Sequence, residues 1–176
     1  MASEPLLQQI KASYKLINGI LGALNNKMMV GGIFCDLQKA FDCVNHNILL
    51  TKLKFYGITC KMHKLIKSYL EGRYQKVVLN NNSPDSSSNW GKITHGVPQE
   101  SILGPLLFLL YINDLPQITN ENSKLILYAD DTSLIITTPN PTNFERNINT
   151  VFHDINRWFD TNLLSLNLNK TQYAIC

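Results

Sequence analysis

The sequence has few cysteines, and none of them is arranged for binding zinc. Its 176 residues include four, Cys35, Cys43, Cys60 and Cys176, with no C-x-x-C pair and no zinc-ligand spacing. We expect them to be reduced and mostly buried, as is typical of an intracellular protein, nuclear or cytoplasmic. The first residues also lack the basic and then apolar regions of a secretory signal, so secretion is not expected.

Long apolar runs and strong net charge are missing too. The most apolar stretch, residues 102–112, contains glycine and proline and is far shorter than the roughly 20 residues that cross a bilayer, so no membrane span is expected. A net charge of +3 is too small to indicate a nucleic acid partner by itself. With 44% hydrophobic residues, the chain is long enough for one domain, or one large subdomain, with a real core.

Positive charge is nevertheless concentrated in one segment. Seven of the 16 basic residues lie between Lys52 and Lys76, against the single acid Glu71, and aromatic residues are interleaved with them. A phosphate backbone favours this composition. A solvated helix face beside core aromatics explains it equally well. The candidates for contact with nucleic acid are Lys61, Lys64, Lys67 and Arg73.

The apolar spacing predicts an α+β domain with a small antiparallel sheet and helices packed on one face. Helices are expected over residues 5–25, 46–56, 60–70 and 106–112, and from a capping box at Thr142 and Glu145 onward. Strands are expected over residues 28–37, 74–79, 89–94, 125–128 and 134–136, with a strand–turn–strand after 165 and an exposed, mobile loop at 80–88. The first helix is expected to bury one stripe, formed by Leu6, Leu7, Ile10, Tyr14, Ile17, Leu21 and Leu24.

Two adjacent carboxylates interrupt the expected hairpin at residues 125–136. Asp130 and Asp131 lie in its turn, residues 129–132, where two charges about 4 Å apart repel by about 4 kcal/mol at an effective dielectric near 20. Such a pair suits an exposed turn, or a site where a divalent cation reverses the local sign. Asp36 closes another buried strand, which suits a metal ligand or a helix cap. If that strand end lies beside the turn, three carboxylates meet, and hard oxygen ligands of this kind suit Mg²⁺ in phosphoryl transfer.

Four segments of the chain carry a family resemblance. Residues 34–46 (FCDLQKAFDCVNH), 96–108 (GVPQESILGPLLF) continuing to 111–116 (YINDLP), 128–131 (YADD) and 164–171 (LSLNLNKT) resemble, in order and spacing, the motifs of the reverse transcriptase of non-LTR (LINE-like) retrotransposons. The match runs through nearly the whole chain. It implies that residues 1–176 form a partial reverse transcriptase domain, a palm with part of the fingers and without the thumb.

The resemblance implies an RNA-directed DNA polymerase that adds deoxynucleotides to a primer 3′-hydroxyl on an RNA template. It implies that Asp36 and Asp130 are the main ligands of two Mg²⁺ ions, or of Mn²⁺ in their place. Asp131 then completes the acidic cluster, and the Leu37 carbonyl is a further ligand. The implied partners are the RNA template, the DNA primer and deoxynucleoside triphosphates; no oligomeric state is indicated.

The resemblance also implies roles for three residues at the nucleotide. Phe41 would lie beneath the incoming sugar and exclude a 2′-hydroxyl, Gln99 would contact the nucleotide, and Lys170 would protonate the leaving pyrophosphate. Each has an ordinary alternative: core packing for Phe41, a loop amide for Gln99 and a solvated lysine for Lys170. A metal-dependent nuclease using the same carboxylates has little support, because Phe41 and Gln99 would have no role in it.

One position departs from the family pattern. Glu100 stands where family members usually have glycine, and it adds bulk and negative charge near an anionic nucleotide. We therefore expect Glu100 to weaken nucleotide binding. It also supports an alternative interpretation, a catalytically inactive remnant that at most binds nucleic acid through residues 52–76.

Overall fold

The computed structural model describes residues 4–79, 87–98, 101–129 and 131–175. The chain divides into two compact units. The first combines Met1–Ala40 with Ile112–Cys176, and the second is Phe41–Tyr111. Within the described ranges, no helix combines the length and the apolar character needed to span a membrane.

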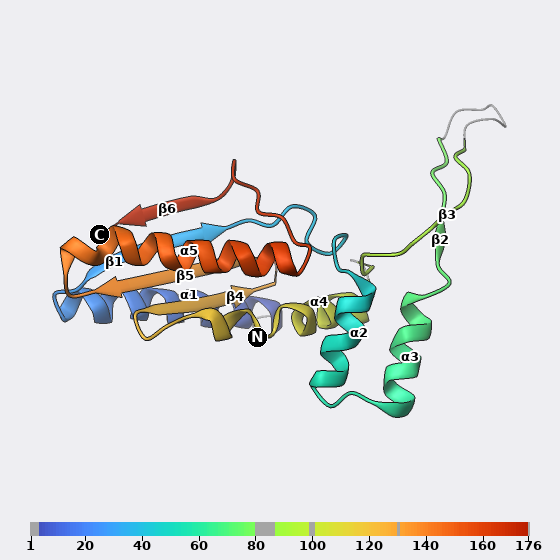
Figure 1. Ribbon diagram of the computed structural model, residues 1–176, viewed down its shortest axis with the longest axis horizontal. Coiled ribbons are helices and arrows are strands. Elements are labelled where there is room, and N and C mark those ends of the chain that lie inside the picture. Colours follow the sequence, from blue (N-terminus) through green and yellow to red (C-terminus); the bar gives the residue numbers. More distant parts are fainter. Residues whose placement is uncertain (1–3, 80–86, 99–100, 130, 176) are drawn as a thin grey trace. The chain divides into compact units, whose positions relative to one another are not determined.

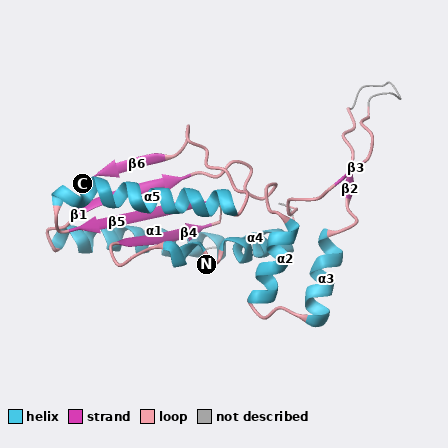
Figure 2. Ribbon diagram, viewed as in Figure 1, coloured by secondary structure: helices cyan, strands magenta, loops and turns pink. Residues whose placement is uncertain are grey.

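The first unit is built on a four-stranded antiparallel sheet (Figure 2). Its strands are β1 (Met29–Cys35), β4 (Ser123–Tyr128), β5 (Asp131–Thr138) and β6 (Gln172–Ile175), in the spatial order β4-β5-β1-β6. The two inner strands, β1 and β5, pair from Met29 with Thr138 to Cys35 with Thr132. The expected strand ending at Asp36 is therefore confirmed as an inner strand of the sheet.

Helices cover both faces of this sheet (Figure 1). Val30 and Ile135 pack in one cluster with Ala23 of α1 (Glu4–Asn25). The next residue of β1, Gly31, faces α5 (Phe144–Thr161) so closely that a Cβ there would lie 2.9 Å from Phe144. Successive strand residues point to opposite faces, so the two helices lie on opposite sides. The α+β architecture is confirmed, but the expectation of helices on one face only is wrong.

Helix α1 buries a different stripe from the one expected. The described side chains of the expected stripe are 40–65% exposed: Leu7, Ile10, Tyr14, Ile17, Leu21 and Leu24. The side chains packed on the sheet are instead Ala12, Leu16, Ile20 and Ala23. Small residues explain the choice, because they let the helix lie close to the sheet; a Cβ at Gly19 would be 3.0 Å from the Ile135 side chain.

The hairpin between β4 and β5 is tighter than expected. Tyr128 pairs directly with Asp131, and Ala129 has a φ of 51°. Asp131 and Thr132 therefore belong to strand β5 and not to the turn. Asp130 lies outside the described residues.

Helix α5 begins later than the capping box predicted. A 3-10 turn, η2 (Pro141–Asn143), precedes it, and its N-cap Asn143 makes no side-chain cap hydrogen bond. The predicted cap is wrong because Asn140 accepts the hydrogen bond from the Thr142 amide instead, at 3.0 Å. The amphipathic pattern is confirmed by its buried residues, Phe144, Val151, Ile155 and Phe159. A second 3-10 turn, η1 (Leu115–Ile118), contacts α5.

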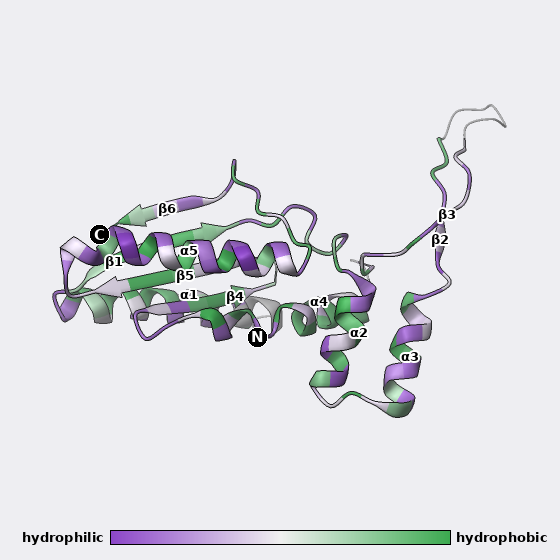
Figure 3. Ribbon diagram, in the orientation of Figure 1, coloured by the Kyte–Doolittle hydropathy of each residue, from purple (hydrophilic) through white to green (hydrophobic). Residues whose placement is uncertain are grey.

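The second unit contains α2 (His46–Phe55), α3 (Cys60–Leu70), the short strands β2 (Tyr74–Gln75) and β3 (Gly91–Lys92), and α4 (Leu103–Ile112) up to Tyr111. The Asn45 Oδ1 accepts hydrogen bonds from the amides of Asn47 and Ile48, which caps α2 as predicted. Helix α3 carries hydrophilic and hydrophobic residues in alternation along its length (Figure 3). Strands β2 and β3 are shorter than predicted, and most of the expected loop at 80–88 lies outside the described residues.

Candidate functional site

Two predicted carboxylates lie at the same end of the sheet. Asp36 follows the last residue of β1, and Asp131 is the first residue of β5. The last pair of the β1–β5 ladder is Cys35 with Thr132, so one further step of the register places Asp36 opposite Asp131. Directly opposed residues of an antiparallel pair point to the same face. The fold therefore places these two carboxylates at the same end of neighbouring strands, although they are far apart in the sequence.

Asp36 is held by the segment that precedes β6. The Asn167 side-chain amide donates a hydrogen bond to Asp36 Oδ2 at 3.0 Å, and Lys170 Nζ lies 4.0 Å from the same oxygen. The Asp36 side chain is 33% exposed, whereas that of Lys170 is 71% exposed. An ion pair this accessible to water contributes about 1 kcal/mol or less. The lysine is thus tethered weakly beside the carboxylate.

The backbone fixes this arrangement. The amide of Gln38 donates to the Ser165 carbonyl and the amide of Asn167 donates to the Asp36 carbonyl, both at 2.8 Å. These two hydrogen bonds flank the antiparallel bridge between Leu37 and Leu166, and neither uses the Leu37 carbonyl. Sequence reasoning gave Asn167 no role; its only signal was its place in the segment 164–171.

One of the two carboxylates lies beside a cavity, and the other follows a buried thiol in the sequence. Asp131 lines a cavity of about 150 Å³ together with Tyr128, Ser133 and residues of α1. Burial raises the pKa of the Cys35 thiol, next to Asp36, to about 11. That thiol is therefore neutral near pH 7 and adds no charge to the site.

The described residues fit part of a divalent-cation site. Carboxylate oxygens are the hard ligands that Mg²⁺ takes in proteins. Among the residues whose positions are described, no group of three or more His, Cys, Asp and Glu side chains gathers as a metal site. The third predicted carboxylate, Asp130, lies outside those residues, between Ala129 and Asp131 in the sequence.

Phe41 belongs to the second unit. Its ring is half-buried, and the ring centre lies 4.8 Å from the ring centre of Phe108, at an interplanar angle of 33°. The Phe41 carbonyl accepts a hydrogen bond from the Val97 amide, and the Val44 carbonyl accepts one from the Gly96 amide, both at 2.8 Å. Two of the quoted motifs, residues 34–46 and 96–108, thus meet at Phe41. Gln99 and Glu100 lie outside the described residues.

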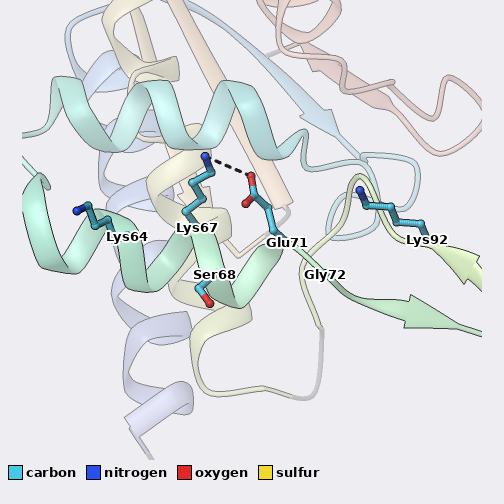
Figure 4. A pocket seen from close by; sticks show the side chains of 6 residues that line it. All are labelled: Lys64, Lys67, Ser68, Glu71, Gly72 and Lys92. Carbon is cyan, nitrogen blue, oxygen red and sulfur yellow. Dashed lines mark ion pairs between the residues drawn. The ribbon is translucent and has the colours of Figure 1, made fainter.

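Two lysines of the basic segment and one lysine beyond it line an open pocket in the second unit, which we call the lysine groove (Figure 4). Lys64 and Lys67 of α3 and Lys92 of β3 line a cavity of about 680 Å³. Glu71 also lines it and pairs with Lys67 at 3.6 Å. Of the other predicted contacts, Lys61 is exposed but does not line this cavity, and the Arg73 guanidinium lies 5.9 Å from the ring centre of Tyr69. Lys92 was not among the sequence candidates.

Comparisons with known proteins agree on one family. The family model "Reverse transcriptase (RNA-dependent DNA polymerase)" matches residues 7–175. The chain is 30% identical over 174 residues to the probable RNA-directed DNA polymerase from transposon BS of Drosophila melanogaster, covering 92% of this chain and 18% of that protein. It is 34% identical over 128 residues to the RNA-directed DNA polymerase from mobile element jockey of the same species, covering 69% of this chain and 13% of that protein. The chain thus spans less than a fifth of these relatives.

Solved structures show the same fold. Apo telomerase from Candida tropicalis, truncated from its C-terminal domain, superposes with a TM-score of 0.66 at 16% identity, over 93% of this chain and 35% of that one. Telomerase of the same species in complex with a fragment of telomeric RNA superposes with a TM-score of 0.63 at 13% identity, over 97% of this chain and 33% of that one.

Proposed function

We propose, from the premise that this chain belongs to the reverse transcriptase family of non-LTR retrotransposons, that it carries the catalytic segment of an RNA-directed DNA polymerase. The observation that supports this most directly is that Asp36 and Asp131 lie at one end of the sheet. Asp131 is also next in sequence to Asp130. In nucleotidyl transfer the primer 3′-hydroxyl loses its proton to solvent and its oxygen bonds to the α-phosphorus. The bond from the α-phosphorus to the oxygen that bridges it to the β-phosphate breaks, which releases pyrophosphate.

In this proposal Asp36, Asp130 and Asp131 hold two Mg²⁺ ions, or Mn²⁺ in their place. When bound, such cations supply charge stabilisation at the attacking and leaving oxygens. The contacts of Asp36 with Asn167 and Lys170 fall on Oδ2, so Oδ1 is the oxygen that we assign to the metal. The Leu37 carbonyl, unused in the bridge to Leu166, is a fourth oxygen ligand.

Lys170 is the proposed proton donor to the pyrophosphate. In the structure Lys170 Nζ lies 4.0 Å from Asp36 Oδ2. Neutralising the carboxylates would remove the attraction that holds its ammonium there, because the local charge changes sign. The flexible, exposed side chain is then available to the anionic leaving group. Phe41 and Gln99 are proposed to contact the sugar and the incoming nucleotide.

We propose different roles for the two units. We assign the first unit to the palm and the second, with its lysine groove, to part of the fingers, within a partial reverse transcriptase domain over residues 1–176. The proposed partners are an RNA template, a DNA primer and deoxynucleoside triphosphates. An intracellular location is also proposed. Of the described cysteines, all free thiols, Cys35 is buried, Cys43 is half-buried and Cys60 is exposed, so the expectation that they are mostly buried is wrong.

Extension of a DNA primer on an RNA template, dependent on Mg²⁺, tests the proposed activity. A folded chain that binds the template and primer but never extends the primer would instead be an inactive remnant. The departure at Glu100 is the observation that favours that second function.

Glu100→Gly is expected to lower KM for deoxynucleotides about tenfold, because it removes a negative charge close to a triphosphate and restores backbone freedom. The measurement is steady-state primer extension at varied nucleotide concentration. Glu121→Gly, at an exposed position in the first unit, is the matched control and should leave KM unchanged. Equal KM and kcat for the Glu100→Gly and unmodified chains would show that Glu100 does not hinder the nucleotide.

A further inference from the structure

The two short strands of the second unit place four side chains on one face. Tyr74 pairs with Lys92, and two further steps of the register place Lys76 opposite Trp90. The contact across that second pair is present, with Lys76 Nζ 5.4 Å from the centre of the Trp90 ring. Directly opposed and alternate residues share a face of a β-ribbon. Tyr74, Lys76, Trp90 and Lys92 therefore form one aromatic–lysine face.

This face is accessible and uniformly cationic. Trp90 is 65% exposed and Tyr74 is 56% exposed. Residues 72–79 and 87–95 contain no Asp or Glu. Two large aromatic rings exposed beside lysines form a surface that suits a ligand with flat apolar faces and negative charge.

Lys92 connects this face to the lysine groove. It is on the ribbon with Trp90 and also lines the cavity of about 680 Å³ with Lys64 and Lys67 of α3 (Figure 4). The acid in the groove, Glu71, is already paired with Lys67. A chain of phosphates lying in the groove would thus meet cations at each side, and would continue directly onto the aromatic rings.

We propose that α3 and the β2–β3 ribbon bind an unpaired RNA strand, with its phosphates in the lysine groove and a base stacked on Trp90. Unpaired bases expose the flat faces that stack on aromatic side chains, whereas bases in a duplex do not. This proposal rests on the proposed function, in which the unpaired strand is template that has not yet been copied. It adds Trp90, Tyr74, Lys76 and Lys92 to the groove lysines.

Binding of a fluorescently labelled 12-nucleotide single-stranded RNA, measured by anisotropy in EDTA without nucleotides, tests the proposal. Trp90→Ala is expected to weaken binding about 5- to 100-fold, the range that loss of one stacked base produces, while Trp90→Phe retains most of the affinity. Lys92→Gln is expected to lower the slope of log affinity against log salt by about one. The exposed Lys15, on α1 in the first unit, provides the matched control Lys15→Gln, which should change neither quantity.

Fluorescence provides a second readout. In a Trp158→Phe background, Trp90 is the single tryptophan of the chain, and stacking of a base is expected to quench its emission as RNA is added. Three outcomes would each overturn the proposal. The first is an unchanged RNA affinity in Trp90→Ala, and the second is RNA binding that does not quench the emission of Trp90. The third is displacement of the RNA by polyglutamate that itself binds through Trp90. The binding assay contains neither Mg²⁺ nor nucleotides, so its result does not depend on catalysis. A chain that binds RNA here but fails to extend a primer in the separate activity assay would refute only the proposed activity.

Discussion

Replacing Asp36 with asparagine is expected to lower the rate of primer extension by about 1,000-fold. Loss of one carboxylate from a two-cation site removes about 4 kcal/mol of transition-state stabilisation. The fold should survive, because asparagine has the same shape and its side-chain oxygen can still accept the hydrogen bond from Asn167. The measurement is single-turnover extension on an RNA template, with thermal unfolding of both proteins followed by circular dichroism.

Asp154→Asn is the matched control for this prediction. Asp154 is on α5 in the same unit, its side chain is 50% exposed, and its Oδ1 lies 3.7 Å from His153 Nδ1. The same loss of charge at that position should leave the extension rate within about twofold of the unmodified chain. An Asp36→Asn protein that retained more than about a tenth of the rate would remove Asp36 from the metal site.

Phe41→Val is expected to reduce discrimination against ribonucleotides by about 100-fold. The Phe41 ring packs at 4.8 Å from Phe108, which is fully buried, and its carbonyl is bound by the Val97 amide. A ring fixed in this way cannot move aside, so a clash with a 2′-hydroxyl costs several kcal/mol. Each 1.36 kcal/mol corresponds to a factor of ten in rate. Valine is shorter and makes room for the hydroxyl.

The ratio of kcat/KM for a deoxynucleotide to that for the matching ribonucleotide measures this effect. Phe41→Tyr keeps the ring and should keep the ratio. If Phe41 only packs in the core, Phe41→Val should lower stability by about 1–3 kcal/mol and leave the ratio unchanged. The two interpretations of Phe41 that the sequence left open are thereby separated.

Helix boundaries were most predictable where the signals are local. Asn45 caps α2 with its own side chain, and Gly57, with a φ of 85°, follows the end of that helix. Cap and turn chemistry depends only on neighbouring residues, so it is legible in one sequence. The failed capping box at Thr142 shows the limit, because Asn140 competes for the same amide.

The buried stripe of α1 was not predictable in the same way. The helix has one set of large apolar residues, including Ile10 and Tyr14, and a second set with alanines, including Ala12 and Ala23. Periodicity identifies both sets but does not say which one meets the sheet. That choice depends on how closely the helix can approach Ile135, which only the fold determines.

The residues of the candidate site also differ in whether local sequence patterns identify them. Asp36 and the pair Asp130 and Asp131 were recognisable because each carboxylate ends or joins an apolar run. Asn167 lies 131 positions from Asp36, and no local pattern links the two. Trp90 and Lys92 were missed for a related reason: their partners Lys76 and Tyr74 lie across the ribbon, and only its register joins them.

The most direct test of the central claim is Mg²⁺-dependent primer extension on an RNA template by this chain and by its Asp130→Asn form. The two-cation proposal predicts extension by the unmodified chain and loss of at least about 1,000-fold in the variant, with equal binding of template and primer. Extension that is equal in both proteins, or its absence from a folded and template-bound unmodified chain, would contradict the claim that these carboxylates perform nucleotidyl transfer.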